Sequence, residues 1–219
     1  MPFDPHACER AAVIRYAQEW LRTPYHHGGR VKGAGVDCAM LLAEVYAEAG
    51  LVRHLAIPHY PPDWHLHRDA ERYLGVLLDH AVEYLPVIAS PQGEAIQAGS
   101  LRRNAPRDDD KSIMPRRPIL PADIALWRFG RCFSHGAIVV DWPIVIHAYL
   151  GRGCVLEDAA KAEWLSRIGE GRDAQARLRP VKFFTLKRWT DSSLRVPVGS
   201  EAIQDAGSLR CARDDAEHP

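Results

Sequence analysis

The chain has 219 residues, of which 47% are hydrophobic and 26% are charged, a composition sufficient for one globular domain with its own core. Lys+Arg and Asp+Glu number 28 each, so a net charge of zero gives no support for a nucleic-acid or anionic-membrane partner. No apolar run approaches the ~18 residues of a membrane span, and no apolar segment follows residues 1–10. We therefore expect no membrane association and synthesis in the cytoplasm without a signal peptide.

The first half of the sequence predicts helices. Residues 6–22 keep a helical period that ends at Pro24, and a Gly-rich loop follows. A second helix is expected to begin near Asp37 and to end at Gly50, a natural C-terminal cap. Its apolar residues form a single stripe: Cys38, Leu41, Leu42, Val45 and Ala49. A third helix is predicted over about 68–85.

The second half predicts strands. Candidates are 124–129 and a hairpin of 135–140 with 145–149, which turns at Asp141-Trp142-Pro143. Further strands are expected in 154–157 and 176–187. Helices followed by an antiparallel sheet indicate an α+β fold, with N-terminal helices packed on the sheet.

Two stretches of the chain are near copies of each other, at 94–109 and 201–215. Neither copy has convincing periodicity, and a repeat architecture needs a hydrophobic face on each unit and usually three or more units. The copies are better explained as translated dispersed DNA repeats. We therefore expect a disordered insertion at about 90–117 and a disordered tail at 191–219, attached to one domain over 1–190.

The five cysteines are far apart, odd in number and without a CxxC pair, which argues against a disulfide framework or a zinc knuckle. Cys38 opens the second predicted helix, where unpaired N–H groups favour a thiolate and can stabilise an oxyanion. A helix start is thus expected to lower the thiol pKa. The alternative is a small buried hydrophobe, which is a common role of free cysteine.

Two histidines supply a candidate base. His135 and His147 are equidistant from Asp141, so the predicted hairpin places them opposite each other, with Cβ atoms ~4.5–5.5 Å apart. His135 would accept the thiol proton while His147 orients its ring, as in a catalytic triad. The alternative is two unrelated histidines among eleven. The others, such as His26-His27 and the pair 65 and 67, fit no recognised zinc spacing, and no metal or cofactor is expected.

Several short motifs resemble those of NlpC-type cell-wall endopeptidases, papain-like enzymes that cut peptidoglycan stem peptides. The motifs are TPYHHGG at 23–29, GVDCAMLL at 35–42, LPADIALW at 120–127, SHGAI at 134–138 and VIHA at 145–148. Their order and spacing both match the family over most of residues 10–190 outside the insertion. The resemblance implies a papain-like fold and a cysteine peptidase.

The resemblance also implies a role for each motif residue. Cys38 would attack the peptide carbonyl, His135 would act as general base, and His147 would orient it. Tyr25 matches the tyrosine whose hydroxyl joins the Cys38 N–H in stabilising the oxyanion. Asp37 matches an aspartate that binds the substrate amine, although a helix N-cap is an equally good interpretation.

The sequence departs from the family directly after the nucleophile. Ala39-Met40 replaces the usual Ser-Gly, so a hydroxyl near the substrate is missing, and with it the basis for expecting recognition of a free N-terminal L-alanine. Asp123 matches a structural aspartate that precedes a core strand.

Family versions without signal peptides resemble those of phage, prophage and gene-transfer-agent tails. The resemblance therefore implies a peptidoglycan peptide substrate, phage tail proteins as partners, and delivery in a tail particle. Two alternatives stay open: a catalytically impaired tail assembly module, and a thiol amidase or acyltransferase on the same fold.

Overall fold

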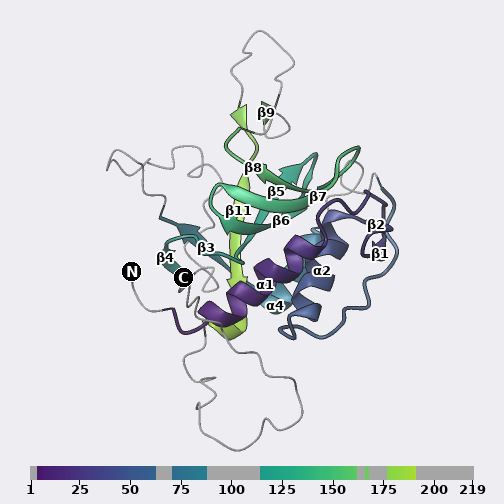
Figure 1. The fold of residues 1–219 in the computed structure, drawn as a ribbon. Helices are drawn as coiled ribbons and strands as arrows, with labels where there is room; N and C mark the ends of the chain where they lie inside the picture. Colours follow the sequence, from purple (N-terminus) through teal and green to yellow (C-terminus); the bar gives the residue numbers. More distant parts are fainter. Residues whose placement is uncertain (1–3, 63–70, 88–113, 162–165, 168–176, 191–219) are drawn as a thin grey trace, which may run out of the picture.

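The computed structural model describes residues 4–62, 71–87, 114–161, 166–167 and 177–190. In these residues, three helices pack against a seven-stranded sheet (Figure 1), which confirms the predicted α+β class with N-terminal helices on a largely antiparallel sheet. The two copies of the internal repeat, at 94–109 and 201–215, and the predicted tail at 191–219 lie outside the described residues.

The first two helices form where the sequence predicts them. Helix α1 spans Ala7–Glu19 and helix α2 spans Cys38–Glu48. The Asp37 carboxylate caps α2 by accepting the N–H groups of Ala39 and Met40. Gly50 follows the helix with φ 69°, a left-handed conformation that glycine adopts without steric cost.

The third predicted helix is too long. Helix α4 spans only Arg72–His80, and strand β3, Ala81–Pro86, follows it directly. Strand β3 pairs antiparallel with strand β11, Val181–Leu186, in a register that sets Tyr84 opposite Phe183. Both rings are buried, so pairing and burial with a distant strand outweigh the local helical period.

The sheet has the strand order β4-β3-β11-β5-β6-β7-β8. Neighbouring strands are antiparallel except β3 and β4, which run parallel. The remaining strands of this sheet are β4 (Met114–Arg117), β5 (Ile124–Phe129), β6 (Cys132–Asp141), β7 (Ile144–Tyr149) and β8 (Gly153–Asp158). Two short pairs lie outside it, β1 (Arg30–Val31) with β2 (Gly35–Val36) and β9 (Ser166–Arg167) with β10 (Arg177–Leu178), and a 3-10 turn, Lys187–Trp189, follows β11.

The predicted disordered insertion at 90–117 is wrong for its last four residues, because 114–117 form the edge strand β4. The Arg117 guanidinium lies 2.9 Å from the buried carboxylate of Asp123 and 4.6 Å from the centroid of the Tyr84 ring. These contacts with the sheet keep 114–117 ordered. Residues 88–113 are outside the described part of the chain.

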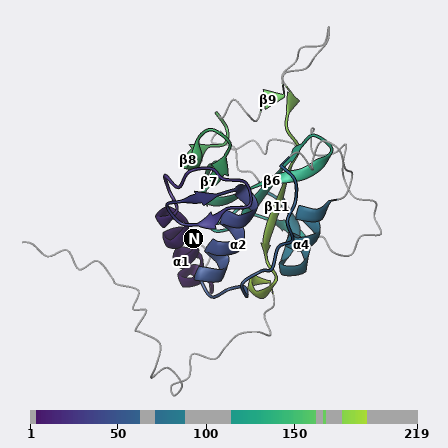
Figure 2. The same cartoon turned by 90° about the vertical axis from the view of Figure 1, so that its right-hand side faces the viewer.

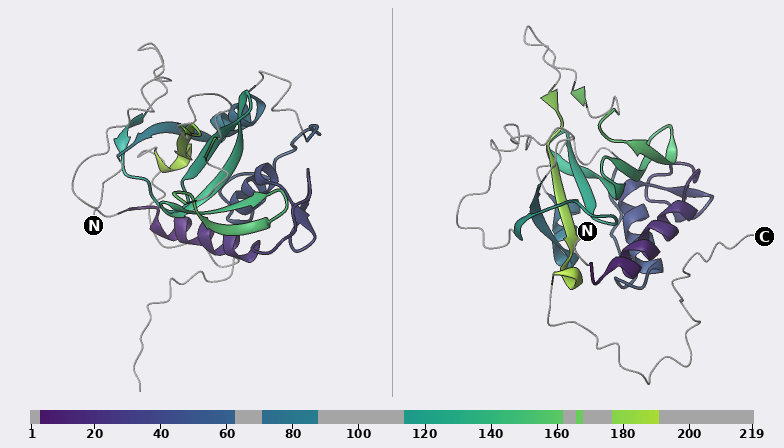
Figure 3. Two further views of the ribbon diagram at one scale, coloured as in Figure 1. Left: turned by 90° about the horizontal axis from the view of Figure 1, so that it is seen from above. Right: turned by 60° about the vertical axis from the view of Figure 1, so that its left-hand side comes forward.

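Helices α1, α2 and α4 of the described residues cover the same face of the sheet. Helices α1 and α2 lie side by side on it (Figure 3), and α4 lies to one side of α2 (Figure 2). The core between the layers includes Leu41 of α2, Leu126 of β5 and Ile138 of β6. This packing fixes the start of α2 against strand β6.

Asp123 has the structural role predicted for it. Its side chain is fully buried and accepts hydrogen bonds from Arg10 of α1, Tyr84 of β3 and Arg117 of β4. Arg10 also donates to the carbonyl of Pro121. The aspartate therefore ties the helix layer to the edge of the sheet, far from any role in chemistry.

Candidate active site

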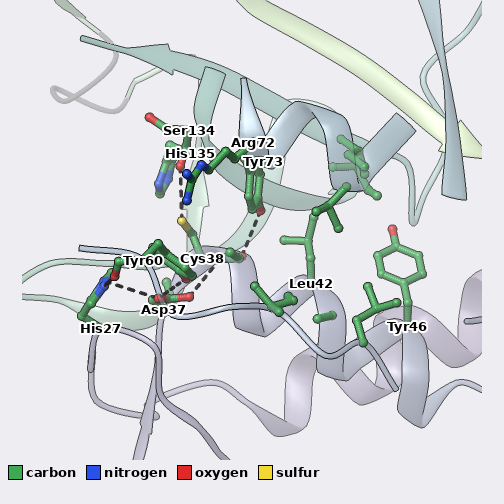
Figure 4. A pocket seen from close by; sticks show the side chains of 18 of the residues that line it. His27, Asp37, Cys38, Leu42, Tyr46, Tyr60, Arg72, Tyr73, Ser134 and His135 are labelled. Carbon is green, nitrogen blue, oxygen red and sulfur yellow. Dashed lines mark hydrogen bonds and ion pairs between the residues drawn. The ribbon is translucent and has the colours of Figure 1, made fainter. Parts of the chain in front are cut away.

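The cavity beside the start of α2 holds the predicted nucleophile. Cys38 is the first residue of the helix, and its half-buried thiol donates to the carbonyl of Ser134 in β6 at 3.6 Å. Figure 4 shows the sulfur directed from α2 toward Ser134 and His135. The sequence thus placed the thiol correctly, and the fold brings it to the strand that carries the predicted base.

Asp37 is fully engaged in holding the loops around the nucleophile. Its Oδ1 accepts the N–H groups of Ala39 and Met40 at 3.1 and 2.9 Å. Its Oδ2 accepts the Gly28 N–H at 2.7 Å and the Tyr60 hydroxyl at 2.6 Å. This geometry satisfies the N-cap interpretation. Binding of a substrate amine by Asp37 stays a prediction.

His135 and His147 are in direct contact. The Nε2 atom of His135 lies 2.9 Å from the Nδ1 atom of His147, and both rings are buried. The Nε2 atom of His147 lies 2.9 Å from Oε2 of Glu157 in β8. The Arg152 guanidinium in turn lies 2.6 Å from the other oxygen of Glu157. The histidine pair is therefore part of a longer hydrogen-bonded chain.

The two histidines are not directly opposed, as the hairpin prediction required. The register pairs Val139 with Val145, with an irregularity before Asp141, and its continuation sets His147 opposite Ala137. His135 and His147 are thus diagonal neighbours on one face, a separation that long side chains can span. The strands turn between Asp141 and Ile144 instead of around Asp141, and this later turn causes the shift.

The thiol is protonated in the resting site. Burial, and to a lesser extent the nearby Asp37 carboxylate, raise the pKa of Cys38 to about 12. The backbone N–H groups of Gly136, Cys38 and Ala39 act in the opposite direction. The N–H groups at the helix start lower the thiol pKa as predicted, but the expected thiolate is wrong, because loss of hydration outweighs their effect.

Both histidines are neutral at pH 7. Burial lowers the pKa of His135 well below its usual value, and His147 and Arg179 lower it further. Burial also lowers the pKa of His147, although the hydrogen bond and the charge of Glu157 oppose this effect. The resting site therefore contains a neutral thiol and two neutral imidazoles, rather than a thiolate–imidazolium pair.

Tyr25 lines the cavity with Cys38 and His135. Burial raises the pKa of Tyr25, and the neighbouring Cys38 and Asp37 raise it further. An isolated parallel bridge to Val36 holds the Tyr25 backbone beside the loop that leads into α2. Tyr25 therefore keeps its proton, while its role as a donor to an oxyanion, which the resemblance implies, stays a prediction.

The cavity has a volume of about 910 Å³ and extends from Cys38 between α2 and α4. Most of its lining is apolar, and this part includes Leu42, Tyr46, Val76, Leu77, Ile124 and Leu186. Helix α4 adds Arg72 and Tyr73 to the lining near the thiol (Figure 4). The Tyr73 hydroxyl donates to the Cys38 carbonyl at 3.2 Å, which ties α4 to the start of α2.

The sequence did not reveal four residues of the site, which are Tyr60, Arg72, Tyr73 and Glu157. The first three lie near a predicted loop or helix whose position relative to α2 depends on tertiary packing. Glu157 had a weak signal, because the β7–β8 hairpin pairs His147 with Val155, and Glu157 is two residues further on the same face. Only the register of that hairpin reveals this relation.

Within the described residues, no three His, Cys, Asp or Glu side chains are grouped to hold a metal ion. None of the described helices is long and apolar enough to cross a membrane.

Comparisons with known proteins give a weak structural likeness. No protein-family model matches the chain, and a search of curated proteins finds no match. The NlpC/p60 domain of the peptidoglycan hydrolase SagA is 16% identical, with a TM-score of 0.41 over 69% of this chain and 90% of that one. NlpC1 from Trichomonas vaginalis is 17% identical, with a TM-score of 0.42 over 84% of this chain but only 45% of that one.

Proposed function

We propose that this chain is a cysteine hydrolase in which Cys38 attacks a carbonyl carbon and His135 takes the thiol proton. One observation carries the proposal. The thiol at the start of α2 shares a cavity with His135, and His135 belongs to a hydrogen-bonded chain that includes His147 and Glu157. Nucleophile, base and orienting group are the three parts that covalent acyl transfer requires.

The protonation states favour general-base catalysis over a preformed ion pair. A neutral imidazole accepts the thiol proton as the sulfur forms its bond to the carbonyl carbon. The Cys38 N–H and the Tyr25 hydroxyl stabilise the resulting oxyanion, because both are donors beside the thiol. The protonated His135 then gives its proton to the leaving amine, and water hydrolyses the thioester with His135 again as base.

We further propose that the substrate is a peptidoglycan stem peptide. The support comes from the NlpC-like motifs around Cys38, His135 and His147. Arg72 adds chemical support, because it places a guanidinium in the cavity and no carboxylate of the described residues pairs with it. Stem peptides carry free carboxylates, which a guanidinium binds well.

Digestion of purified peptidoglycan tests this proposal. The wild-type chain is expected to release fragments with new amino and carboxyl termini inside the stem peptide, measured by mass spectrometry. Cys38→Ala is expected to release none, whereas Cys154→Ala, which alters a buried thiol outside the cavity, is expected to retain activity. Equal digestion by the Cys38→Ala variant would show that the thiol is not the nucleophile.

A second candidate function is acyl transfer or amide hydrolysis on the same fold. One observation favours it, namely the largely apolar lining of the cavity beside Cys38. Release of intact stem peptides from the sugar would identify an amidase. Turnover of nitrophenyl esters that rises steeply with acyl-chain length, without cleavage of stem peptides, would identify an acyl-group enzyme.

A catalytically impaired tail assembly module is the third candidate. The raised pKa of the Cys38 thiol favours it, because a neutral thiol is a weak nucleophile. Particles assembled with Cys38→Ala that infect normally, together with no turnover by the wild-type chain, would support this role.

We also propose that the chain acts in a phage-like tail particle, which rests on the sequence resemblance alone. Mass spectrometry of purified particles from the source cells tests it. Detection of the chain in intact particles is the expected result, and its presence only in particle-free fractions would contradict the proposal.

A further inference from the structure

We propose that Glu157 is a positioning residue that sets the tautomers of both histidines, so that Nδ1 of His135 is the basic nitrogen of the site. The inference rests on the proposed hydrolase function and extends it to a residue on a third strand. It starts from the geometry of strands β6, β7 and β8.

The three side chains lie on one face of three adjacent strands. His147 pairs with Val155 across the β7–β8 ladder, so Glu157 is its diagonal neighbour. The continued register of β6 and β7 makes His135 and His147 diagonal in the same way. In both contacts, His135 to His147 and His147 to Glu157, the partner lies two residues from the directly opposed position, and the polar atoms are 2.9 Å apart. The relay therefore crosses the sheet without using residues of the helix layer.

The carboxylate determines the direction of both hydrogen bonds. Arg152 lies 2.6 Å from Oε1 of Glu157, which favours the charged form of the carboxylate. An ionised carboxylate can only accept, so the Nε2 atom of His147 carries the proton that is donated to Oε2.

The direction of the His147–His135 hydrogen bond follows from the tautomer of His147. A neutral imidazole has one donor and one acceptor nitrogen, so Nδ1 of His147 must accept. The Nε2 atom of His135, 2.9 Å away, must then donate to it. The proton of His135 is thus on Nε2, and Nδ1 is the nitrogen that can take the thiol proton.

Without Glu157 the relay can reverse. His147 could then carry its proton on Nδ1 and donate it to Nε2 of His135, which would force the His135 proton onto Nδ1. Nδ1 of His135 could then no longer accept the thiol proton, although the His135 ring would not have moved. A wrong tautomer has this consequence in the Ser–His–Asp triad, where replacing the orienting carboxylate by an amide lowers kcat about 10⁴-fold.

Glu157 also acts on the charged intermediate. When His135 accepts the thiol proton, the imidazolium donates through Nε2 to His147, which is held by the carboxylate. The other cations near the relay, Arg179 beside His135 and Arg152 beside His147, oppose a positive charge on the rings. Glu157 is the acid that counters them, so its loss is expected to reduce kcat more than KM.

Nitrogen NMR of the full chain tests the inference directly. Long-range proton–nitrogen correlations on chain labelled with ¹⁵N-histidine distinguish a protonated Nδ1 from a protonated Nε2. The wild type is expected to show Nε2–H on both His135 and His147, assigned by comparison with His135→Gln and His147→Gln. Nδ1–H on either ring of the wild type would overturn the inference.

Substitutions at Glu157 separate orientation from charge. Glu157→Ala is expected to populate Nδ1–H on both rings and to lower kcat by roughly 100-fold or more, with little change in KM. Glu157→Gln removes the charge and presents an N–H donor as well as an acceptor oxygen, so it is expected to give a mixture of Nε2–H and Nδ1–H and to lower kcat. Asp158→Ala removes the next carboxylate of β8, which pairs with Lys161 rather than with the histidines, and it is the matched control with wild-type tautomers. Unchanged tautomers and unchanged kcat in Glu157→Ala would overturn the inference.

The NMR reading needs no substrate, so the two proposals can fail separately. If the wild-type tautomers are as stated but no substrate is turned over, the hydrolase proposal fails while Glu157 still sets the tautomers. If turnover is Cys38-dependent but unaffected by Glu157→Ala, only the role of Glu157 fails. Melting temperatures of all variants exclude loss of folding as the cause.

Discussion

At the scale of single residues, the Cys38 thiol has a pKa that differs most from the one its position in the chain predicts. It lies at a helix start, yet burial and the Asp37 carboxylate raise its pKa to about 12. A preformed thiolate would react with an alkylating reagent at a constant rate across neutral pH. A protonated thiol reacts faster as the pH rises.

We therefore predict that alkylation of Cys38 by iodoacetamide accelerates continuously from pH 6 to pH 10 without a plateau, because about tenfold more thiolate forms per pH unit below the thiol pKa. Peptide mapping by mass spectrometry measures the rate at each cysteine. Exposed Cys8 provides an internal comparison in the same sample. A plateau at Cys38 below pH 7 would show that an ion pair exists in the resting enzyme.

A second prediction at the scale of single residues concerns Arg72. It is the first residue of α4, where a positive charge is unfavourable toward the helix dipole, and it lines the cavity with Cys38. Arg72→Gln is expected to raise KM for a carboxylate-bearing stem peptide by roughly tenfold or more, since a charge-assisted hydrogen bond contributes about 1.5–3 kcal/mol. Steady-state kinetics measure this change, with kcat expected to stay close to wild type.

The matched comparison uses a peptide whose carboxylates are converted to amides. Wild type and Arg72→Gln are expected to have the same KM for that peptide, and Arg72→Lys is expected to be intermediate for the charged one. An equal loss on both peptides would show that Arg72 supports the site without recognising a carboxylate.

At the scale of elements, contact between α4 and β6 positions the mouth of the site. A Cβ at Gly136 of β6 would collide with the Tyr73 hydroxyl, the same hydroxyl that donates to the Cys38 carbonyl. Gly136→Ala is therefore expected to displace α4 and to lower stability by about 1–3 kcal/mol, the usual cost of overpacking. Urea unfolding measures the loss.

The double variant tests whether this contact is the cause. Tyr73→Phe removes the atom nearest to the new methyl group, so Gly136→Ala is expected to cost less in the Tyr73→Phe background than in the wild type. Additive losses would mean that the strain arises elsewhere.

Much of the element level can be predicted from the sequence, because helical stripes and alternating strands are local patterns. Helix α2 with its Asp37 cap and strand β5 form where the sequence places them. Strand β3 could not be predicted, because its residues follow a helical period and its pairing with β11 joins segments about a hundred residues apart. Edge strand β4 could likewise not be predicted, because its contacts are to Tyr84 and Asp123.

The site was predictable to the same extent. Cys38 and the two histidines were proposed from a helix start, a hairpin and the NlpC-like motifs, and the structure places Cys38 and His135 in one cavity with His147 beside His135. Glu157 could not be placed from the sequence, because its contact with His147 depends on two registers that a shift of one residue would have changed. The thiol pKa depends on burial, which no local pattern specifies.

At the scale of the whole molecule, the buried histidines link the site to folding. The pKa values of His135 and His147 are both lowered from 6.5 in the folded chain. The unfolded chain therefore binds more protons at low pH, so their contribution to stability is complete above pH 6.5 and is lost as the pH falls below it.

We predict that the free energy of unfolding, measured with urea, falls between about pH 7 and pH 5.5, and that His147→Gln reduces this fall. His54→Gln is the matched control for replacing a histidine, because His54 is largely exposed and does not contact the relay. An identical slope in the wild type and His147→Gln would show that His147 does not resist protonation.

The account as a whole depends on Cys38 forming a covalent intermediate, and its most direct measurement is mass spectrometry of the protein quenched in acid during turnover of a stem peptide. The expected result is an acyl adduct on the peptide that contains Cys38, absent from Cys38→Ala and reduced in His135→Gln. Turnover without any adduct on Cys38, retained in the Cys38→Ala variant, would contradict the account.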